Sequence, residues 1–398
     1  MPPLLLESDA HLRLAKQIAA LFLTVIACMV SAHAQPPRYA TLHSFSISDG
    51  SLPDASPIHD EEGNLYGTTY KGGGRNAGTV FKLDLNGNLI TLHEFGLGDG
   101  AGPTAALVRD IHGNLYGTTS GGGSRACAYG CGSIFRVDAA GVFTSLYLFT
   151  GGTDGDTPMG PLVLDQEGNL YGTTRYGGIT DNGTIFKLQP DGTLITLHLF
   201  AGFPDGEQPF AGLVADAAGN FYGTTYAGGN AFNFRTIFKL DASGHETVLY
   251  RFKGSADGSS PYSGVILDEA GNLYGTTVGG GGSGGGFGPG VVYKLDTKGI
   301  YTVLHTFEDQ GGVTCYAPLV RDGNGNLYGT TILGGSRNFG TVFRLELSGR
   351  YRVLHNFLGG PDRGRNYSGL LRDKVGNLYG TTTRGGTNTV GTVFEIIF

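Results

Sequence analysis

The sequence predicts an all-β protein, a seven-bladed β-propeller with four strands in each blade. The motif GNLYGTT, once written GNFYGTT, occurs seven times, beginning at residues 63, 113, 168, 219, 271, 325 and 376. Repeats at intervals near 50 residues are typical of propellers and related arrays. Each interval contains four short apolar segments between glycine-bearing turns, a pattern that indicates strands rather than helices. A segment that the last unit lacks stands at the start of the chain, which predicts a closed ring.

The first two segments of each unit are joined by a tight turn. The first segment ends in aspartate and is found at 56–60, 105–110, 160–165, 211–216, 263–268, 317–322 and 368–373. The second is the GNLYGTT segment itself. An Asp-x-x-Gly sequence joins them, as in Asp60 to Gly63, and suits a type I turn with a left-handed glycine. The glycine within the strand, such as Gly67, should let an aromatic ring of the third segment lie against the backbone. We therefore interpret the motif as structural rather than as a seven-fold binding device.

The third and fourth segments complete the unit. The third reads GTVFKLD or close variants, at 78–84, 132–138, 183–189, 235–241, 290–296, 340–346 and 391–397. The fourth reads LITLHEF or variants, at 89–95, 143–149, 194–200, 246–252, 301–307 and 351–357. The last unit has no fourth segment, whereas YATLHSF at 39–45 has that pattern and precedes the first unit. We expect this N-terminal strand to complete the last blade and so to remove the exposed edges of an open array.

The repeat unit also resembles a known family. The pattern LVxDxxGNLYGTTxxGG, followed by GTVFKLD and LHxF, is similar to the GloVer tandem repeat of the choice-of-anchor secreted bacterial proteins, over residues 39–398. The resemblance implies export and a propeller-like fold, and it implies no activity. Members differ in a sorting anchor, and this chain ends inside a strand. A weaker likeness to kelch blades rests on the Gly-Gly pair after the second strand.

The N-terminus has the features of a secretion signal. Arg13 and Lys16 precede an apolar run at 18–30, and Ala32-His33-Ala34 matches a signal-peptidase site. This predicts a signal peptide at 1–34 and a single mature domain at 35–398, secreted or periplasmic, with no transmembrane segment and monomeric. An alternative is lipidation at Cys28, which would also provide surface attachment. The net charge of −7 and the absence of a basic run argue against a nucleic-acid partner.

The variable loops predict one candidate site. The connections between the second and third strands and between blades are long and should share one face, where binding residues usually lie. Four successive blades carry an aromatic residue just before the innermost strand, and the nearby loops carry arginines. These candidate ligand-binding residues are Phe210, Tyr262, Tyr316, Tyr367, Arg235, Arg337 and Arg384. They could recognise a carbohydrate or an anionic polymer, or the aromatics could simply fill the channel.

Other polar residues favour structural roles. The fourth strand carries histidine in five blades, at His43, His93, His198, His305 and His355, and we expect packing or local hydrogen bonds there and no metal site. The channel-side residues of the innermost strands, His59, Arg109, Arg321 and Arg372, are a further candidate anion site. Cys127 and Cys131 should form a local disulfide in an exported protein, which leaves Cys315 over.

The sequence is compatible with two functions. The first is a non-enzymatic binding or scaffold module without a cofactor, whose loop-rich face engages an extracellular polysaccharide or protein. The second is a polysaccharide lyase or hydrolase that uses the channel mouth. A carboxylate or histidine with a shifted pKa in the channel mouth would favour the enzyme.

Overall fold

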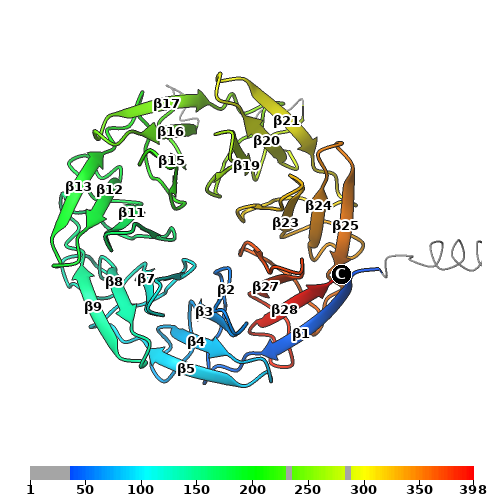
Figure 1. The fold of residues 1–398 in the computed structure, drawn as a ribbon, viewed down its shortest axis with the longest axis horizontal. Coiled ribbons are helices and arrows are strands. Elements are labelled where there is room, and N and C mark those ends of the chain that lie inside the picture. The colour runs from blue at the N-terminus through cyan, green and yellow to red at the C-terminus, as the bar shows by residue number, and fades with distance from the viewer. Residues whose placement is uncertain (1–35, 230–234, 283–287) are drawn as a thin grey trace, which may run out of the picture. The chain divides into compact units, whose positions relative to one another are not determined.

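The strands form seven four-stranded antiparallel sheets arranged around a ring (Figure 1). The computed structural model describes residues 36–229, 235–282 and 288–398, and every secondary-structure element in these ranges is a strand. The predicted fold class, a seven-bladed β-propeller, is confirmed. The proposed signal sequence and Cys28 lie outside the described residues. None of the described segments is a helix long and apolar enough to cross a membrane.

Each blade contributes its strands from the centre outward in chain order. The innermost strands are β2 (Ile58–His59), β6 (Val108–Arg109), β10 (Val163–Leu164), β14 (Val214–Ala215), β18 (Ile266–Leu267), β22 (Val320–Arg321) and β26 (Leu371–Arg372). The second strands, which hold the repeated motif, are β3 (Leu65–Thr69), β7 (Leu115–Thr119), β11 (Leu170–Thr174), β15 (Phe221–Thr224), β19 (Leu273–Thr276), β23 (Leu327–Thr331) and β27 (Leu378–Thr382).

The outer two strands of each blade have at least five residues, against two in the innermost strand. The third strands are β4 (Thr79–Leu83), β8 (Ser133–Val137), β12 (Thr184–Leu188), β16 (Thr236–Leu240), β20 (Val291–Leu295), β24 (Thr341–Leu345) and β28 (Thr392–Ile397). The fourth strands are β5 (Leu89–Glu94), β9 (Phe143–Leu148), β13 (Leu194–Leu199), β17 (Glu246–Arg251), β21 (Tyr301–Thr306), β25 (Tyr351–Asn356) and, from the N-terminus, β1 (Arg38–Ser44).

The N-terminal strand closes the ring as predicted. The last sheet has the order β1-β28-β27-β26, so the outermost strand of the seventh blade comes from the other end of the chain (Figure 1). The seventh blade in turn contacts the first, because the Thr381 hydroxyl donates to the carbonyl oxygens of Pro53 and Ala55 at 3.0 and 3.1 Å. Both ends of the repeat array are therefore paired, and this leaves no open sheet edge between the first and last blades.

Hydrogen bonds explain the first half of the repeated motif. In the first blade the Asp60 carboxylate accepts from the backbone N–H and side-chain amide of Asn64 at 2.8 and 2.7 Å, and from the Tyr66 hydroxyl at 2.9 Å. Gly63 in the turn has a φ of 91°, which favours glycine. The backbone and tyrosine contacts recur in all seven blades, at Asp60, Asp110, Asp165, Asp216, Asp268, Asp322 and Asp373.

The second half of the motif packs the blade and joins it to its neighbour. A Cβ added to Gly67 would lie 2.6 Å from Cζ of Phe81, so only glycine lets that ring approach, as predicted. The Thr68 hydroxyl donates to the Ala105 carbonyl of the next blade at 3.4 Å. The Thr69 hydroxyl lies 2.8 Å from that of Thr79 on the third strand. Together with the buried leucine, these contacts give each motif residue a structural role.

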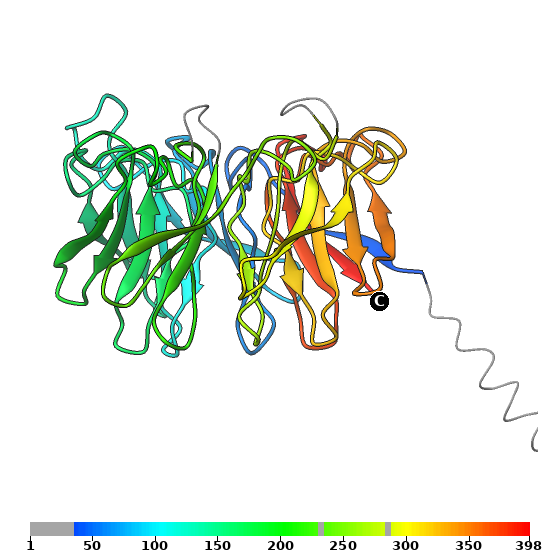
Figure 2. The same ribbon diagram turned by 90° about the horizontal axis from the view of Figure 1, so that it is seen from above.

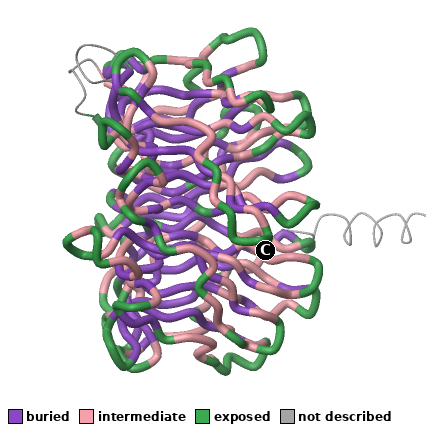
Figure 3. The backbone as a smooth tube through the Cα atoms, turned by 90° about the vertical axis from the view of Figure 1, so that its left-hand side faces the viewer, coloured by how far each residue is buried: buried purple, intermediate pink, exposed green. Residues whose placement is uncertain are grey.

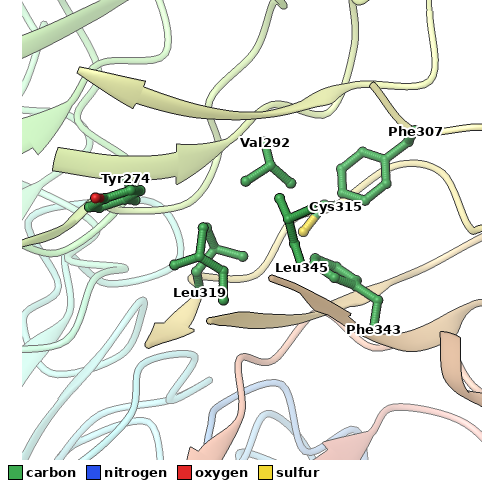
Figure 4. Packing of buried hydrophobic residues seen from close by; sticks show 8 residues of the cluster. Tyr274, Val292, Phe307, Cys315, Leu319, Phe343 and Leu345 are labelled. Atoms are coloured by element: carbon green, nitrogen blue, oxygen red, sulfur yellow. The ribbon is translucent and has the colours of Figure 1, made fainter. Parts of the chain in front are cut away.

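The core lies between adjacent blades rather than within one layer. Figure 4 shows one such cluster, in which Tyr274 and Val292 of the fifth blade meet Phe343 and Leu345 of the sixth. Cys315 belongs to this cluster, is fully buried and has a free thiol. Buried residues follow the strands, and the exposed ones gather in the connections at both faces (Figure 3).

One core position departs from the repeat and gives a stability prediction. Tyr293 stands where the six other blades have phenylalanine, and its hydroxyl is buried with no hydrogen-bond partner among the described residues. Burial raises its pKa. We expect Tyr293→Phe to raise the free energy of unfolding by about 1 kcal/mol, because it removes a buried, unpaired hydroxyl. Urea denaturation measures this, and a loss of stability would show that the hydroxyl has a partner.

The two faces of the propeller differ in their connections. Figure 2 shows tight hairpin turns on one face and long connections on the other. On the long-loop face, Cys127 and Cys131 form a disulfide with an S–S distance of 2.02 Å, inside the connection between β7 and β8. The connections that differ most among the seven repeats therefore lie on the long-loop face. Variable loops on a rigid scaffold are where binding sites usually lie.

Candidate functional site

The four predicted aromatic residues form one continuous row of rings. Phe210 contacts Tyr262 with ring centroids 5.4 Å apart, Tyr262 contacts Tyr316 at 4.8 Å, and Tyr316 contacts Tyr367 at 5.4 Å. Each ring precedes the innermost strand of its blade, so the repeat itself brings together residues about 50 positions apart. The rings are partly exposed, and Tyr367 at 40% is the most exposed. We call these four residues the aromatic row.

Two arginines and a fifth aromatic residue extend one end of the aromatic row. The Arg175 guanidinium lies over the ring of Phe210 at 5.3 Å and over that of Tyr176 at 4.7 Å. Arg235 lies over Tyr226 at 4.8 Å, and the Tyr226 ring is 5.1 Å from that of Tyr262. Cation–π contacts of this kind hold a guanidinium in place and leave its charge available to a ligand.

The electrostatics of this end follow from the same contacts. A hydrogen bond with Tyr262, together with the nearby charges of Arg235 and Arg175, lowers the pKa of Tyr226 despite its partial burial. Burial, followed by the interaction with Tyr226, raises the pKa of Tyr262. The Nε atoms of Arg175 and Arg235 are buried without a hydrogen-bond partner among the described residues. The end of the row near Phe210 is therefore locally positive, although the chain as a whole is acidic.

The other two predicted arginines lie apart from these ring contacts. Arg337 and Arg384 are exposed and belong to the long connections of the sixth and seventh blades. The described cation–π contacts with the aromatic row and with Tyr226 come from Arg175 and Arg235. Of the three arginines proposed from the sequence, the structure brings only Arg235 into this group.

A carboxyl group continues the circle beyond Tyr367. Asp54 occupies in the first blade the repeat position that the aromatic row occupies in the fourth to seventh. A Cβ added to Gly369 would lie 2.8 Å from Oγ of Ser56, so the segments that hold Tyr367 and Asp54 are neighbours. The Asp54 Oδ1 atom is buried without a hydrogen-bond partner in the described part of the chain. Burial raises the pKa of Asp54 to about 7.

Four of the five fourth-strand histidines make a local hydrogen bond to an aspartate, whereas His305 stacks on Tyr351. The imidazole Nε2 of His93 lies 3.0 Å from a carboxylate oxygen of Asp99 in the following inter-blade loop. The same arrangement joins His43 to Asp49 at 3.2 Å and His355 to Asp362 at 3.1 Å. In two blades tyrosine replaces histidine, and it donates to the equivalent aspartate. Each pair ties the outer strand to the loop that starts the next blade.

Two of the three innermost arginines form ion pairs, and the third, Arg372, lies over the ring of Tyr328 at 5.9 Å. Arg109 and Arg321 form ion pairs with Glu61 and Glu269 of the preceding blade, at 2.8 and 3.4 Å. A cavity of about 1270 Å³ on the tight-turn face includes Arg109 in its lining. Its carboxylates Asp110 and Asp165 accept the turn and tyrosine hydrogen bonds described above. We place the candidate site at the aromatic row, because Arg109, Asp110 and Asp165 in this cavity already pair with other residues of the fold.

Comparison with known families agrees with the repeat seen in the structure. The model of the Gloeobacter/Verrucomicrobia repeat matches residues 29–234, 126–288 and 235–397. The chain belongs to the Gloeobacter/Verrucomicrobia repeat family. The resemblance to GloVer repeats noted from the sequence is thereby confirmed. No curated protein matches the chain significantly in sequence.

Solved structures share the fold of this Gloeobacter/Verrucomicrobia repeat protein. The extracellular domain of a protein assigned as a hybrid two-component system from B. thetaiotaomicron aligns with a TM-score of 0.56 and 11% identity. That alignment covers 90% of this chain and 39% of the other, so this chain spans less than half of the solved domain. A gluconolactonase from Xanthomonas campestris aligns at a TM-score of 0.42 and 18% identity, over 75% of this chain and 92% of that one. The first likeness supports the fold alone, and the second is too distant to support an argument.

Sequence reasoning missed Arg175, Tyr226 and Asp54. Arg175 and Tyr226 both directly follow the GTT of the motif, in the third and fourth blades. Aligning the repeats at that position shows tyrosine or arginine in three blades, so this signal was available. Asp54 is visible in the same alignment as the polar counterpart of the aromatic row, but its burial is not visible there.

Proposed function

We propose that this repeat protein is an exported binding module that recognises an acidic polysaccharide at the aromatic row. The observation that supports this most is the continuity of the row, in which four rings from four blades touch in sequence and end at two guanidinium groups. The secretion-like N-terminal sequence and the family fit an extracellular or periplasmic location.

The chemistry of the row matches such a ligand. Partly exposed aromatic rings offer apolar faces with little conformational entropy to lose, and the tyrosine hydroxyls can bind sugar hydroxyls. A guanidinium group forms bidentate hydrogen bonds with a carboxylate or a sulfate. A chain of uronic or sulfated sugars would therefore place its rings along the row and an acidic group near Arg175 and Arg235.

The proposal predicts loss of binding when the row is interrupted. We expect the purified protein to bind acidic polysaccharides on a glycan array and Tyr262→Ala/Tyr316→Ala to weaken binding by about 30-fold, since two central contacts of about 1 kcal/mol or more are lost. Arg175→Ala should reduce the preference for acidic over neutral chains. Tyr129→Ala is the matched control, because Tyr129 is 90% exposed on the same face but lies outside the row. Absence of glycan binding, or equal binding by all variants, would rule out this proposal.

A second candidate function rests on Asp54. A carboxyl group with a pKa of about 7 is roughly half protonated at neutral pH, and beside a polymer-binding surface it can act as a general acid in glycosidic bond cleavage. If the protein is a lyase or hydrolase, a polysaccharide that it binds should be shortened over time, and Asp54→Asn should stop this without weakening binding. Binding without any shortening of the chain, measured by size-exclusion chromatography, would leave the binding module as the function.

A further inference from the structure

One junction between blades departs from the pattern of the other six. At four junctions an aromatic residue that begins the next outer strand covers the ring of the histidine or tyrosine described above. Centroid distances are 3.6 to 4.2 Å for the pairs His93–Phe143, Tyr250–Tyr301, His305–Tyr351 and His355–Tyr39. At two further junctions this position holds leucine, Leu89 and Leu194. Between the third and fourth blades it holds Glu246.

Glu246 completes a cluster of three groups that can bind a metal ion. His198 on β13, Asp205 in the inter-blade loop and Glu246 at the start of β17 each offer one ligand atom, and these atoms lie within 4.8 Å of one another. The His198 Nε2 atom is 3.1 and 3.2 Å from the two carboxylate oxygens of Asp205. The side chains of His198 and Asp205 keep 19% and 17% of their exposure, so an ion can reach them.

The Glu246 carboxyl group is an unusual residue for this position. Its Oε1 atom is buried and has no hydrogen-bond partner among the residues the structure describes. Burial and the neighbouring Asp205 raise the pKa of Glu246 to about 8. The nearby cation, Arg251, donates to the Pro204 carbonyl oxygen at 2.9 Å, which holds the loop rather than satisfying Oε1. Two carboxyl groups brought together in this way need either a shared proton or a cation.

We propose that His198, Asp205 and Glu246 form a site for a divalent transition-metal ion that bridges the third and fourth blades. An imidazole nitrogen and two carboxylate oxygens suit Zn²⁺ and related ions, and ligands about 2.0–2.2 Å from such an ion lie roughly 3–4 Å from each other. The three groups need only small side-chain movements to reach that arrangement. Water would complete the coordination, because the cluster is partly open to solvent.

The site would fix the loop that leads to the aromatic row. Asp205 lies in the connection between β13 and β14, and Phe210 follows it in the same connection. An ion held by both outer strands and by this loop would add a direct link between the third and fourth blades. Because the folded state alone assembles the three ligands, bound metal should also raise the thermal stability of the protein.

Isothermal titration of tag-free, chelator-treated protein with Zn²⁺ tests this inference. We expect binding of one equivalent, weakened about 100-fold by Glu246→Gln. Asp362→Asn is the matched control: it alters the same histidine–aspartate pair at the junction that Tyr39 covers, and it should leave Zn²⁺ affinity unchanged. Glu246→Tyr restores the aromatic pattern and should fold but lose both Zn²⁺ binding and the Zn²⁺-dependent rise in Tm.

Two outcomes would overturn the metal site. One is the absence of stoichiometric Zn²⁺ binding by the unaltered protein, which would leave a proton shared between Asp205 and Glu246 as the explanation of their proximity. The other is an equal loss of affinity in Glu246→Gln and Asp362→Asn, which would indicate weak binding to surface histidines in general. Neither outcome bears on polysaccharide recognition, which is measured separately at the aromatic row.

Discussion

Phe45→Ala should lower the free energy of unfolding by about 3–5 kcal/mol, as much as Phe95→Ala does. Phe45 directly follows β1, is fully buried, and meets the ring of Phe81 in the first blade at 5.2 Å. Phe95 has the equivalent place after β5 and meets Phe135 at 5.1 Å. The two residues differ in the connectivity of their strands. β1 comes from the N-terminus and pairs with the C-terminal strands of the seventh blade, whereas β5 follows the third strand of its own blade directly in the chain.

This pair of variants measures ring closure directly. If the N-terminal strand is docked as firmly as the others, the two substitutions create similar cavities and cost similar free energy in urea denaturation. A cost below about 1 kcal/mol for Phe45→Ala, beside the full cost for Phe95→Ala, would show that the seventh blade forms without its N-terminal strand. The expected equality follows from the repeat, since both rings pack against the phenylalanine of the next blade's third strand.

The repeat made the fold predictable from the sequence. The same residue types recur at the same positions of all seven repeats. The roles of a turn aspartate such as Asp60 and of a packing glycine such as Gly67 could therefore be predicted from the sequence. Closure was also readable, because the segment missing from the last unit stands at residues 39–45. The aromatic row was predictable for the same reason: residues at one repeat position become neighbours around a ring.

Contacts between residues at different repeat positions could not be predicted from the sequence. Arg175 stacks on Phe210 of the next blade, and Glu246 meets Asp205 across a blade junction. Such contacts depend on the stagger between blades and on the path of each long loop, neither of which the repeat period specifies. The burial of individual polar side chains could not be predicted either. Asp54 reads as one more polar residue before an inner strand, and only the packed structure shows that its Oδ1 is enclosed.

The structure also predicts acid sensitivity of the whole propeller. Burial raises the pKa of the turn carboxyls, but the hydrogen bonds from the asparagine side chain and backbone outweigh it, and the net shift is downward at Asp60, Asp110, Asp165, Asp216, Asp268 and Asp322. A carboxyl with a lowered pKa in the folded state stabilises the protein fully above its unfolded pKa of about 3.9, and this contribution is lost as the pH falls through the folded value. Six such groups should therefore make the free energy of unfolding fall steeply below about pH 4.

Asp322→Ala isolates one of these six sites. Asp322 is only 6% exposed, and its carboxylate accepts from the Asn326 backbone and side chain and from the Tyr328 hydroxyl at 2.8–3.0 Å. Removing it takes the acceptor away from the backbone and side-chain N–H groups of the buried Asn326, so we expect a loss of about 3 kcal/mol at neutral pH and a shallower decline of stability in acid. Asp84→Ala is the control, because Asp84 makes the same kind of turn in an exposed connection and should cost less. Equal losses from the two substitutions would mean that the motif aspartate stabilises only its turn, and that its hydrogen bonds to Asn326 and Tyr328 add nothing to stability.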